Sequence, residues 1–106
     1  MAKELDSNAF KTEILESKSS ALIDFWAPWC GPCRMMGPII DNLAKKFDGQ
    51  LTIAKVNVDN CPDLAAKYNV ASIPTLLFFK KGELVHTSLG VTPEAELEAQ
   101  IKEKIL

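Results

Sequence analysis

The sequence predicts a single α/β domain, spanning residues 1–106, in which a mixed sheet of five strands is flanked by four helices. A chain of 106 residues has the usual length of one domain. Strand-like and helical patterns alternate along most of it, which predicts parallel strands with helices on both faces of the sheet. The last two strand patterns are separated by only Lys81 and Gly82, and so short a turn predicts an antiparallel hairpin. The sheet is therefore expected to be mixed.

The first half of the chain predicts two strands and two helices. Residues 3–5 form a short edge strand, and Asp6 or Ser7 is the candidate cap of the helix that follows. Residues 21–26 are apolar at nearly every position, as expected of a central strand covered on both faces. Apolar side chains then recur at helical spacing up to Gly49. They are Met35, Met36, Ile39, Ile40, Leu43 and Phe47.

The second half predicts three strands and two helices. The strands are expected at residues 51–58, 75–80 and 84–89, with a short helix over 62–68. In the last helix, Thr92 is the predicted cap and Pro93 the first helical residue, because threonine accepts helix N–H groups and proline lacks one. The apolar stripe of this helix is Leu97, Ile101 and Ile105.

Composition excludes several classes of partner. The formal net charge is −2, without the concentrated basic surface that nucleic acid or an acidic membrane requires. No apolar run approaches the roughly 20 residues needed to cross a bilayer. Residues 1–6 show neither a secretory nor an organellar targeting pattern, so we expect a cytoplasmic protein. A processed organellar form would begin in the same way, and that alternative stays open.

The chain has three cysteines, and two of them are close together. An odd number argues against a secreted disulfide framework and favours a reactive or metal-binding pair in a reducing compartment. Cys30 and Cys33 fall between the predicted central strand and the long helix. Two intervening residues at a helix start bring both sulfurs within bonding distance. The sequence therefore predicts a redox-active disulfide, Cys30–Cys33.

The helix start also assigns different roles to the two thiols. Helix-start N–H groups and the helix dipole favour a negative charge, which should lower the pKa of the outer thiol. The thiolate is the attacking species in disulfide exchange. Cys30 precedes the first turn and is expected to be exposed, whereas Cys33 lies inside the helix and is better shielded. We therefore expect Cys30 to be the nucleophile and Cys33 the resolving thiol.

A zinc site is the alternative interpretation of this pair. Cys61 and His86 would complete a set of three cysteines and one histidine. His86 lies in the middle of a predicted strand, however, and no second paired motif follows, so we expect no metal. His86 is expected to be solvated and to have no role.

Several segments together resemble the thioredoxin family. Residues 24–33 read Asp-Phe-Trp-Ala-Pro-Trp-Cys-Gly-Pro-Cys and are similar to the family's active-site segment. Residues 55–59, Ile73-Pro74-Thr75, residues 81–83 and Gly90 follow in the family's order. The resemblance covers nearly the whole chain and implies the thioredoxin fold. The Gly-Pro pair between the cysteines resembles the reducing members, since oxidising and isomerising members usually carry a histidine there.

Asp24 and Lys55 interrupt two apolar strands. Burial of the Asp24 carboxyl would raise its pKa and make it a candidate proton relay for Cys33, a role that the resemblance also implies. The alternative is a hydrogen-bonded structural aspartate. Lys55 in the neighbouring strand is the candidate partner of Asp24, and the alternative is an ordinary surface lysine.

The resemblance further implies a groove for extended substrates. It implies a cis peptide bond at Pro74 that faces the cysteines and leaves the backbone of Ile73 free to pair with a substrate. Trp29 is either core or, with Gly31, Pro32, Ile73 and Gly90, part of an apolar docking surface. The glycines would admit a partner backbone closely.

Three further residues are Met35, Met36 and Cys61. Met35 and Met36 are expected in the core. Cys61 departs from the usual family pattern and precedes a proline at a helix start. It is either a minor regulatory thiol or a partly buried thiol without a role.

The predicted reaction is the reduction of protein disulfides by an electron carrier. No Gly-x-Gly-x-x-Gly segment is present, so we expect no bound cofactor and a separate electron donor. Resemblance implies thioredoxin reductase, an NADPH-dependent flavoprotein, with a ferredoxin-linked reductase as the alternative. The partners are then disulfide-containing client proteins, and the expected state is a monomer. A binding module with incidental cysteines, and an oxidase or isomerase, are the competing functions.

Overall fold

The computed structural model describes residues 2–106, in which one five-stranded sheet has the strand order β1-β3-β2-β4-β5. The strands are β1 (Lys3–Glu4), β2 (Ala21–Trp26), β3 (Thr52–Asn57), β4 (Thr75–Lys80) and β5 (Glu83–Leu89). The helices are α1 (Ser7–Phe10), α2 (Gly31–Lys46), α3 (Pro62–Lys67) and α4 (Glu94–Lys104), and α1 continues as a π-helical segment, η1 (Lys11–Glu16). The predicted mixed α/β architecture is confirmed.

The sheet is parallel on one side and antiparallel on the other. Strand β3 pairs in parallel with both β1 and β2, whereas β4 runs antiparallel to β2 and to β5. Lys81 and Gly82 both have positive φ, 54° and 80°, which matches the turn to the twist of the two strands. The predicted hairpin is therefore confirmed.

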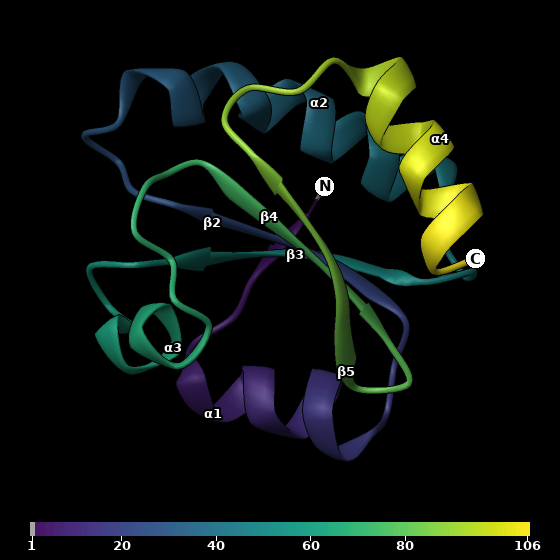
Figure 1. Ribbon diagram of the computed structural model, residues 1–106, viewed down its shortest axis with the longest axis horizontal. Coiled ribbons are helices and arrows are strands. Elements are labelled where there is room, and N and C mark those ends of the chain that lie inside the picture. The colour runs from purple at the N-terminus through teal and green to yellow at the C-terminus, as the bar shows by residue number, and fades with distance from the viewer. Residues whose placement is uncertain (1) are drawn as a thin grey trace.

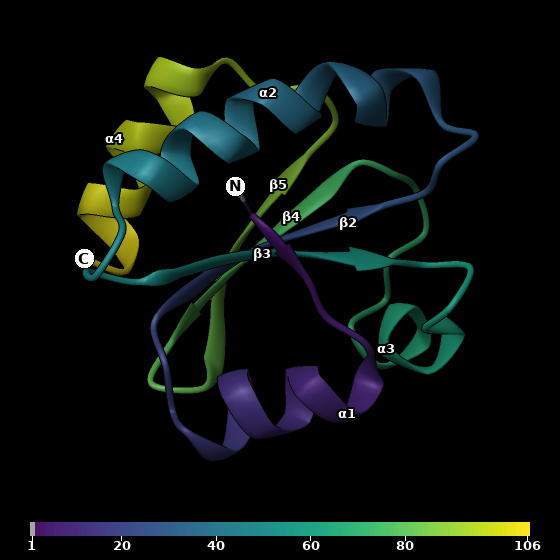
Figure 2. The same cartoon turned by 180° about the vertical axis from the view of Figure 1, so that it is seen from behind.

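Helices cover both faces of the sheet, as Figures 1 and 2 show: α2 and α4 lie on one face, α1 and α3 on the other. The alternation of side chains along β2 divides its residues between these two layers. Ile23 and Phe25 pack on the side of α1 and α3, whereas Leu22 packs on the side of α2 and α4. Asp24, which lies between Ile23 and Phe25, therefore shares the α2 side with Leu22.

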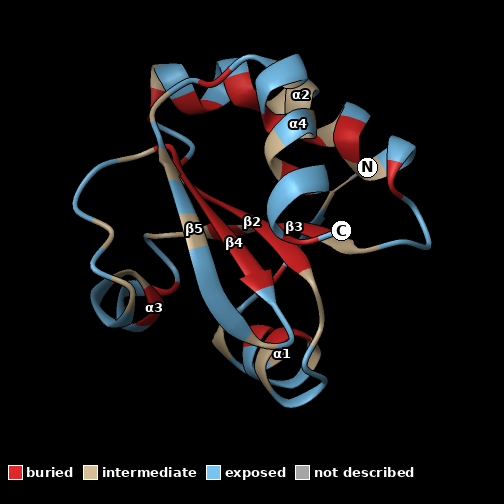
Figure 3. Ribbon diagram, turned by 45° about the vertical axis from the view of Figure 1, so that its right-hand side comes forward, coloured by how far each residue is buried: buried red, intermediate tan, exposed pale blue. Residues whose placement is uncertain are grey.

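The central strands are buried and the outer hairpin strand is not. Figure 3 shows β2 and β4 largely buried, whereas β5 is exposed along most of its length. This pattern places β2 in the buried centre of the sheet, and the loop that follows β2 leaves from there. That loop ends at Cys30, and Cys33 lies in the first turn of α2.

Three details differ from the sequence predictions. Helix α4 begins at Glu94, with Pro93 as a cap that makes no side-chain hydrogen bond, so the predictions of Thr92 as the cap and of Pro93 as the first helical residue are both wrong. The Thr92 hydroxyl is buried and bonds the Ser88 hydroxyl at 2.9 Å, and this nearer partner takes it away from the helix. Met36 is fully buried as predicted, but Met35 is 64 % exposed, because consecutive helical residues point about 100° apart. Asp6 does cap α1, accepting the Ala9 N–H at 2.7 Å.

Candidate active site

Cys30 and Cys33 form a disulfide at the N-terminus of α2, with 5.2 Å between their Cα atoms. Cys30 is the N-cap residue, and its extended backbone turns the chain from β2 into the helix. Its Sγ accepts a hydrogen bond from the backbone N–H of Cys33 at 3.2 Å. A sulfur that receives a helix-start N–H is stabilised when it carries negative charge. The predicted proximity of the two sulfurs is confirmed.

The expected difference in exposure between the two cysteines is not observed. Cys30 is 5 % exposed and Cys33 3 % in this oxidised state. The prediction that Cys30 is exposed is therefore wrong for the disulfide form. The reason is that Ala27, Trp26, Val58 and Ile73 pack around the pair. What distinguishes the two sulfurs is the N–H bond that Cys30 receives.

Asp24 lies on the α2 side of the sheet and is 1 % exposed. Its burial raises the pKa of the carboxyl to about 7, against an opposing effect of the Lys55 ammonium and a smaller, reinforcing effect of the Glu4 carboxylate. Within residues 2–106, its Oδ1 atom has no hydrogen-bond partner. An acid with this pKa exchanges protons readily near neutral pH. The interpretation of Asp24 as a hydrogen-bonded structural residue is thus not supported at Oδ1.

Lys55 on β3 lies opposite Asp24 in the register of the parallel strands. The ion pairs of the described residues do not include a contact between them. The Lys55 ammonium lies instead over the ring of Trp26, with its Nζ 4.6 Å from the ring centroid. Lys55 therefore acts on Asp24 through the electric field rather than through a contact pair.

The segment Ile73–Pro74 reaches the disulfide from the start of β4. Its peptide bond is cis, as the family resemblance implies. The carbonyl oxygen of Ile73 lies 3.8 Å from the Cys30 Sγ. Within the described chain, neither backbone group of Ile73 has a backbone hydrogen-bond partner, whereas the Pro74 carbonyl accepts the Gly90 N–H at 2.9 Å. The Ile73 carbonyl thus lies beside the Cys30 sulfur, without a backbone partner in the described chain.

Trp29 is 67 % exposed, so its interpretation as a core residue is wrong. Its indole N–H donates to the Asp59 carboxylate at 2.9 Å, which holds the ring at the surface next to Cys30. Gly31 is half-buried and Pro32 exposed in the first turn of α2. Gly90 has a positive φ of 76°, and an added Cβ would meet nothing within 4 Å. These residues leave the surface around the disulfide open.

The sequence patterns give no role to Asp59 or Glu4. Asp59 follows the end of β3, and parallel strands bring the ends of β2 and β3 to the same edge of the sheet. The position of Asp59 just after β3 could therefore have predicted its contact with the loop after β2. Glu4 carries no comparable signal, because its approach to Trp26 depends on the register between distant segments.

The residues of the alternative zinc set do not come together. Cys61 is buried in the cluster beneath α1 and α3. His86 packs edge-on against Phe78, with 4.9 Å between ring centroids, and Phe78 belongs to the cluster beneath α2 and α4. The two residues therefore lie on opposite faces of the sheet. His86 is also not simply solvated, because its Nε2 is buried without a partner in the described chain.

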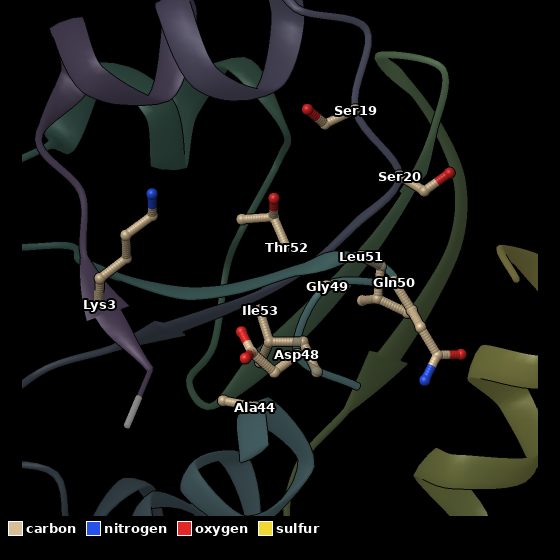
Figure 4. Close-up of a pocket in the computed structure, with 10 residues that line it drawn as sticks. All are labelled: Lys3, Ser19, Ser20, Ala44, Asp48, Gly49, Gln50, Leu51, Thr52 and Ile53. Atoms are coloured by element: carbon tan, nitrogen blue, oxygen red, sulfur yellow. The ribbon is translucent and has the colours of Figure 1, made fainter. Parts of the chain in front are cut away.

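A hollow of about 550 Å³, whose lining residues are drawn in Figure 4, contains no cysteine in its lining. Its lining includes Ser19 and Ser20, which precede β2, and Gly49 and Gln50, which follow α2. Cys30 follows β2 and precedes α2, so the hollow is at the other end of these elements. It contributes nothing to the disulfide site.

Comparison with known proteins agrees with this geometry. The family model described as "Thioredoxin" matches residues 1–103. The chain is 43 % identical over 97 residues to "Thioredoxin" of Porphyra purpurea, covering 92 % of this chain and 91 % of that one. It is 40 % identical over 104 residues to "Thioredoxin 1" of Nostoc sp., covering 98 % and 97 %. It is also 42 % identical over 100 residues to "Thioredoxin M-type, chloroplastic" of Spinacia oleracea, covering 94 % of this chain and 55 % of that one. The chain therefore belongs to the thioredoxin family of dithiol–disulfide oxidoreductases.

Proposed function

We propose that this chain, acting as one domain and as a monomer, is a protein-disulfide reductase that carries electrons from a separate reductase to client proteins. The observation that carries this proposal is the Cys30–Cys33 disulfide at the N-terminus of α2, with the Cys33 N–H donated to the Cys30 Sγ. A thiolate at Cys30 would be stabilised by that N–H and by the helix dipole. The exposed surface around it leaves room for a protein substrate.

The reaction requires the dithiol form of the chain. The Cys30 thiolate attacks one sulfur of a client disulfide, so a bond forms between protein and client while the client S–S bond breaks. The displaced client sulfur leaves as a thiolate and takes up a proton. Cys33 then loses its proton and attacks the Cys30 sulfur, forming the intramolecular disulfide and releasing the second client thiolate. Two electrons pass to the client, and the chain is left oxidised.

Asp24 is the proposed acceptor of the Cys33 proton. Its carboxyl is buried, has a pKa of about 7 and lies on the side of the sheet that α2 covers. Near neutral pH a substantial share of such a group is ionised and ready to take a proton. Lys55 supports this role by favouring the ionised form. An acid with the ordinary aspartate pKa would be a much weaker base.

Client recognition is proposed to use the backbone of Ile73. Its free N–H and C=O would pair with an extended client segment, as in other cases of strand addition. Main-chain bonds do not depend on the client's side chains, which suits a reductase with many clients. Trp29, Gly31, Pro32 and Gly90 would border this segment, with cis-Pro74 beneath it.

The proposed electron donor is thioredoxin reductase, the NADPH-dependent flavoprotein, in the cytoplasm. No helix within residues 2–106 is long and apolar enough to cross a membrane. One relative is named as chloroplastic, which keeps a ferredoxin-linked donor as the second candidate. No cofactor is proposed for the chain itself. Nucleic acid and membranes are not proposed as partners.

The test is NADPH consumption in the presence of thioredoxin reductase and insulin, with Cys30→Ser as the matched variant. Turnover by the natural chain that disappears in the variant would support the redox cycle. If no turnover occurs, a chemical dithiol replaces the reductase as donor. Insulin reduction faster than with the dithiol alone would keep the proposal and reject only the donor, whereas no acceleration would reject a reductase and favour a binding module.

A further inference from the structure

Three charged side chains form a row across neighbouring strands on one level of the sheet. Glu4 on β1 is aligned with Lys55 on β3, and Lys55 is aligned with Asp24 on β2. Side chains at one register level of a parallel sheet point to the same face, which here is the face beneath α2. Exposure falls along the row from exposed Glu4 through half-buried Lys55 to buried Asp24. The sequence Glu–Lys–Asp therefore leads from solvent into the core.

Glu4 and Lys55 contact the same indole. The Nε1 of Trp26 donates to both carboxylate oxygens of Glu4, at 3.1 and 3.3 Å. The Nζ of Lys55 lies 4.6 Å from the centroid of the Trp26 ring. The indole edge thus holds the carboxylate while its face holds the ammonium. This arrangement holds a second carboxylate on the same indole as the lysine that Asp24 also attracts, although the ion pairs of the described residues include no direct Glu4–Lys55 contact.

We propose that Glu4 is a positioning residue of the proton-transfer site, which competes with Asp24 for the Lys55 ammonium and so sets how readily Asp24 takes up a proton. The inference rests on the proposed function, in which Asp24 accepts the Cys33 proton. Glu4 touches neither sulfur and no client. Its effect passes through Lys55 and through direct repulsion of the Asp24 carboxylate.

The direction of the effect follows from the signs of the charges. Burial raises the pKa of Asp24 most, the Lys55 ammonium lowers it, and the Glu4 carboxylate raises it. Removal of the Glu4 charge ends the repulsion and leaves the Lys55 ammonium to Asp24 alone, and both changes lower the pKa. Strand β4 and helix α2 add no titrating group around Asp24 in the oxidised protein. Strand β4 places Leu76 opposite Asp24, and of the residues that α2 buries only Cys33 has an ionisable side chain, which the disulfide keeps from titrating.

The primary experiment is a carbon-13 NMR titration of the Asp24 carboxyl in the oxidised protein. We expect Glu4→Gln to lower the pKa of Asp24 by about half a pH unit, the size expected of one partly solvated neighbouring charge. Glu4→Asp, which keeps the charge, should restore most of the difference. Glu103→Gln is the matched control, because it removes an exposed carboxylate on α4, and it should leave the Asp24 titration unchanged. An unchanged Asp24 titration in Glu4→Gln would overturn the proposal.

The pH dependence of insulin reduction then separates the two proposals. The acid limb is the fall in the rate of insulin reduction as the pH is lowered, which occurs when Asp24 becomes protonated. If both proposals hold, the midpoint of this limb moves to lower pH in Glu4→Gln by the same amount as the NMR pKa. In Asp24→Asn the acid limb disappears. An acid limb that persists in Asp24→Asn would reject the role of Asp24, even where Glu4→Gln changes its carboxyl titration. An Asp24-dependent limb that Glu4→Gln leaves in place would reject the role of Glu4 alone.

Discussion

The backbone N–H of Cys33 lies 3.2 Å from the Sγ of Cys30 and donates a hydrogen bond to it. The two cysteine residues are almost equally buried, so they differ mainly in what the Cys30 sulfur contacts, namely this N–H and, more distantly, the Ile73 carbonyl. An N–H donor at a helix N-terminus stabilises negative charge on the sulfur that receives it. This hydrogen bond therefore predicts that the Cys30 thiolate attacks first.

Replacing either cysteine should stop the cycle at a different stage. Cys33→Ser keeps the attacking sulfur and removes the resolving one, so a mixed disulfide with insulin should accumulate. Cys30→Ser should form no such adduct. Non-reducing electrophoresis with mass spectrometry measures both. Accumulation of the adduct in Cys30→Ser, with none in Cys33→Ser, would reverse the assigned roles.

Asp24→Asn should stabilise the protein at neutral and higher pH. Burial raises the pKa of Asp24 from 3.8 to about 7, so the folded state holds the proton more tightly than the unfolded state does. The contribution of Asp24 to the free energy of unfolding is therefore fully present below pH 3.8, where both states are protonated, and is lost as the pH rises through 7. At pH 8 the gain in Asp24→Asn should approach about 4 kcal/mol, because each pH unit between the two pKa values corresponds to about 1.4 kcal/mol.

Urea denaturation of both proteins at several pH values measures that gain. The two proteins should differ increasingly in unfolding free energy as the pH rises from about 4 to about 8, the range in which the folded and unfolded states bind different numbers of protons. A difference that stays constant over this range would mean that Asp24 does not titrate as its burial requires.

Trp29→Ala should weaken client binding with little loss of stability. The ring is 67 % exposed and is held by Asp59 rather than by the core, so the unfolding free energy should change by less than about 1 kcal/mol. The KM for insulin should rise several-fold. Asp59→Asn is the matched variant, which keeps the ring and weakens its anchor, and it should cause a smaller rise. An unchanged KM in Trp29→Ala would exclude the ring from the docking surface.

Met36→Ala and Met35→Ala form a matched pair. Met36 is fully buried between α2 and the sheet, and truncation of a buried methionine costs about 2–5 kcal/mol of unfolding free energy. Met35 is 64 % exposed, and its truncation should cost less than about 0.5 kcal/mol. Thermal and urea unfolding measure both. Equal losses would contradict the orientation of α2.

Gly82→Ala should be more harmful than Gly49→Ala. Both glycines have a positive φ, 80° and 81°, so each substitution should carry a backbone cost of about 1 kcal/mol. A Cβ at Gly82 would also lie 3.1 Å from the Leu15 carbonyl oxygen, whereas one at Gly49 would meet nothing within 4 Å. The melting temperature of Gly82→Ala should therefore be the lower of the two. Equal melting temperatures would show that the segment around Leu15 gives way.

Most of the fold is predictable because its signals are local. The apolar run of β2, the two-residue turn at Lys81-Gly82 and the cap at Asp6 each depend on a few adjacent residues.

The failed predictions also share a cause, which is that contacts outside the local pattern decided the outcome. Local spacing predicts Thr92 as the cap of α4, but its hydroxyl bonds Ser88, and spacing does not show which partner is nearer. The place of Cys30 before the helix predicts exposure, but Ile73 and Trp26 pack around it.

The chain's own residues, by their order alone, determined the chemistry: two thiols at a helix start, and one acid inside an apolar strand. Helix ends, turns and strand alternation follow from short-range sterics and hydrogen bonding, so they can be predicted from the sequence. Only the tertiary structure decided what surrounds those groups. The alignment of Glu4, Lys55 and Asp24 depends on the register of three strands, and the free backbone of Ile73 depends on how β4 meets the helix. The burial of Cys30 and the electric field at Asp24 arise from such long-range packing, which no local pattern encodes.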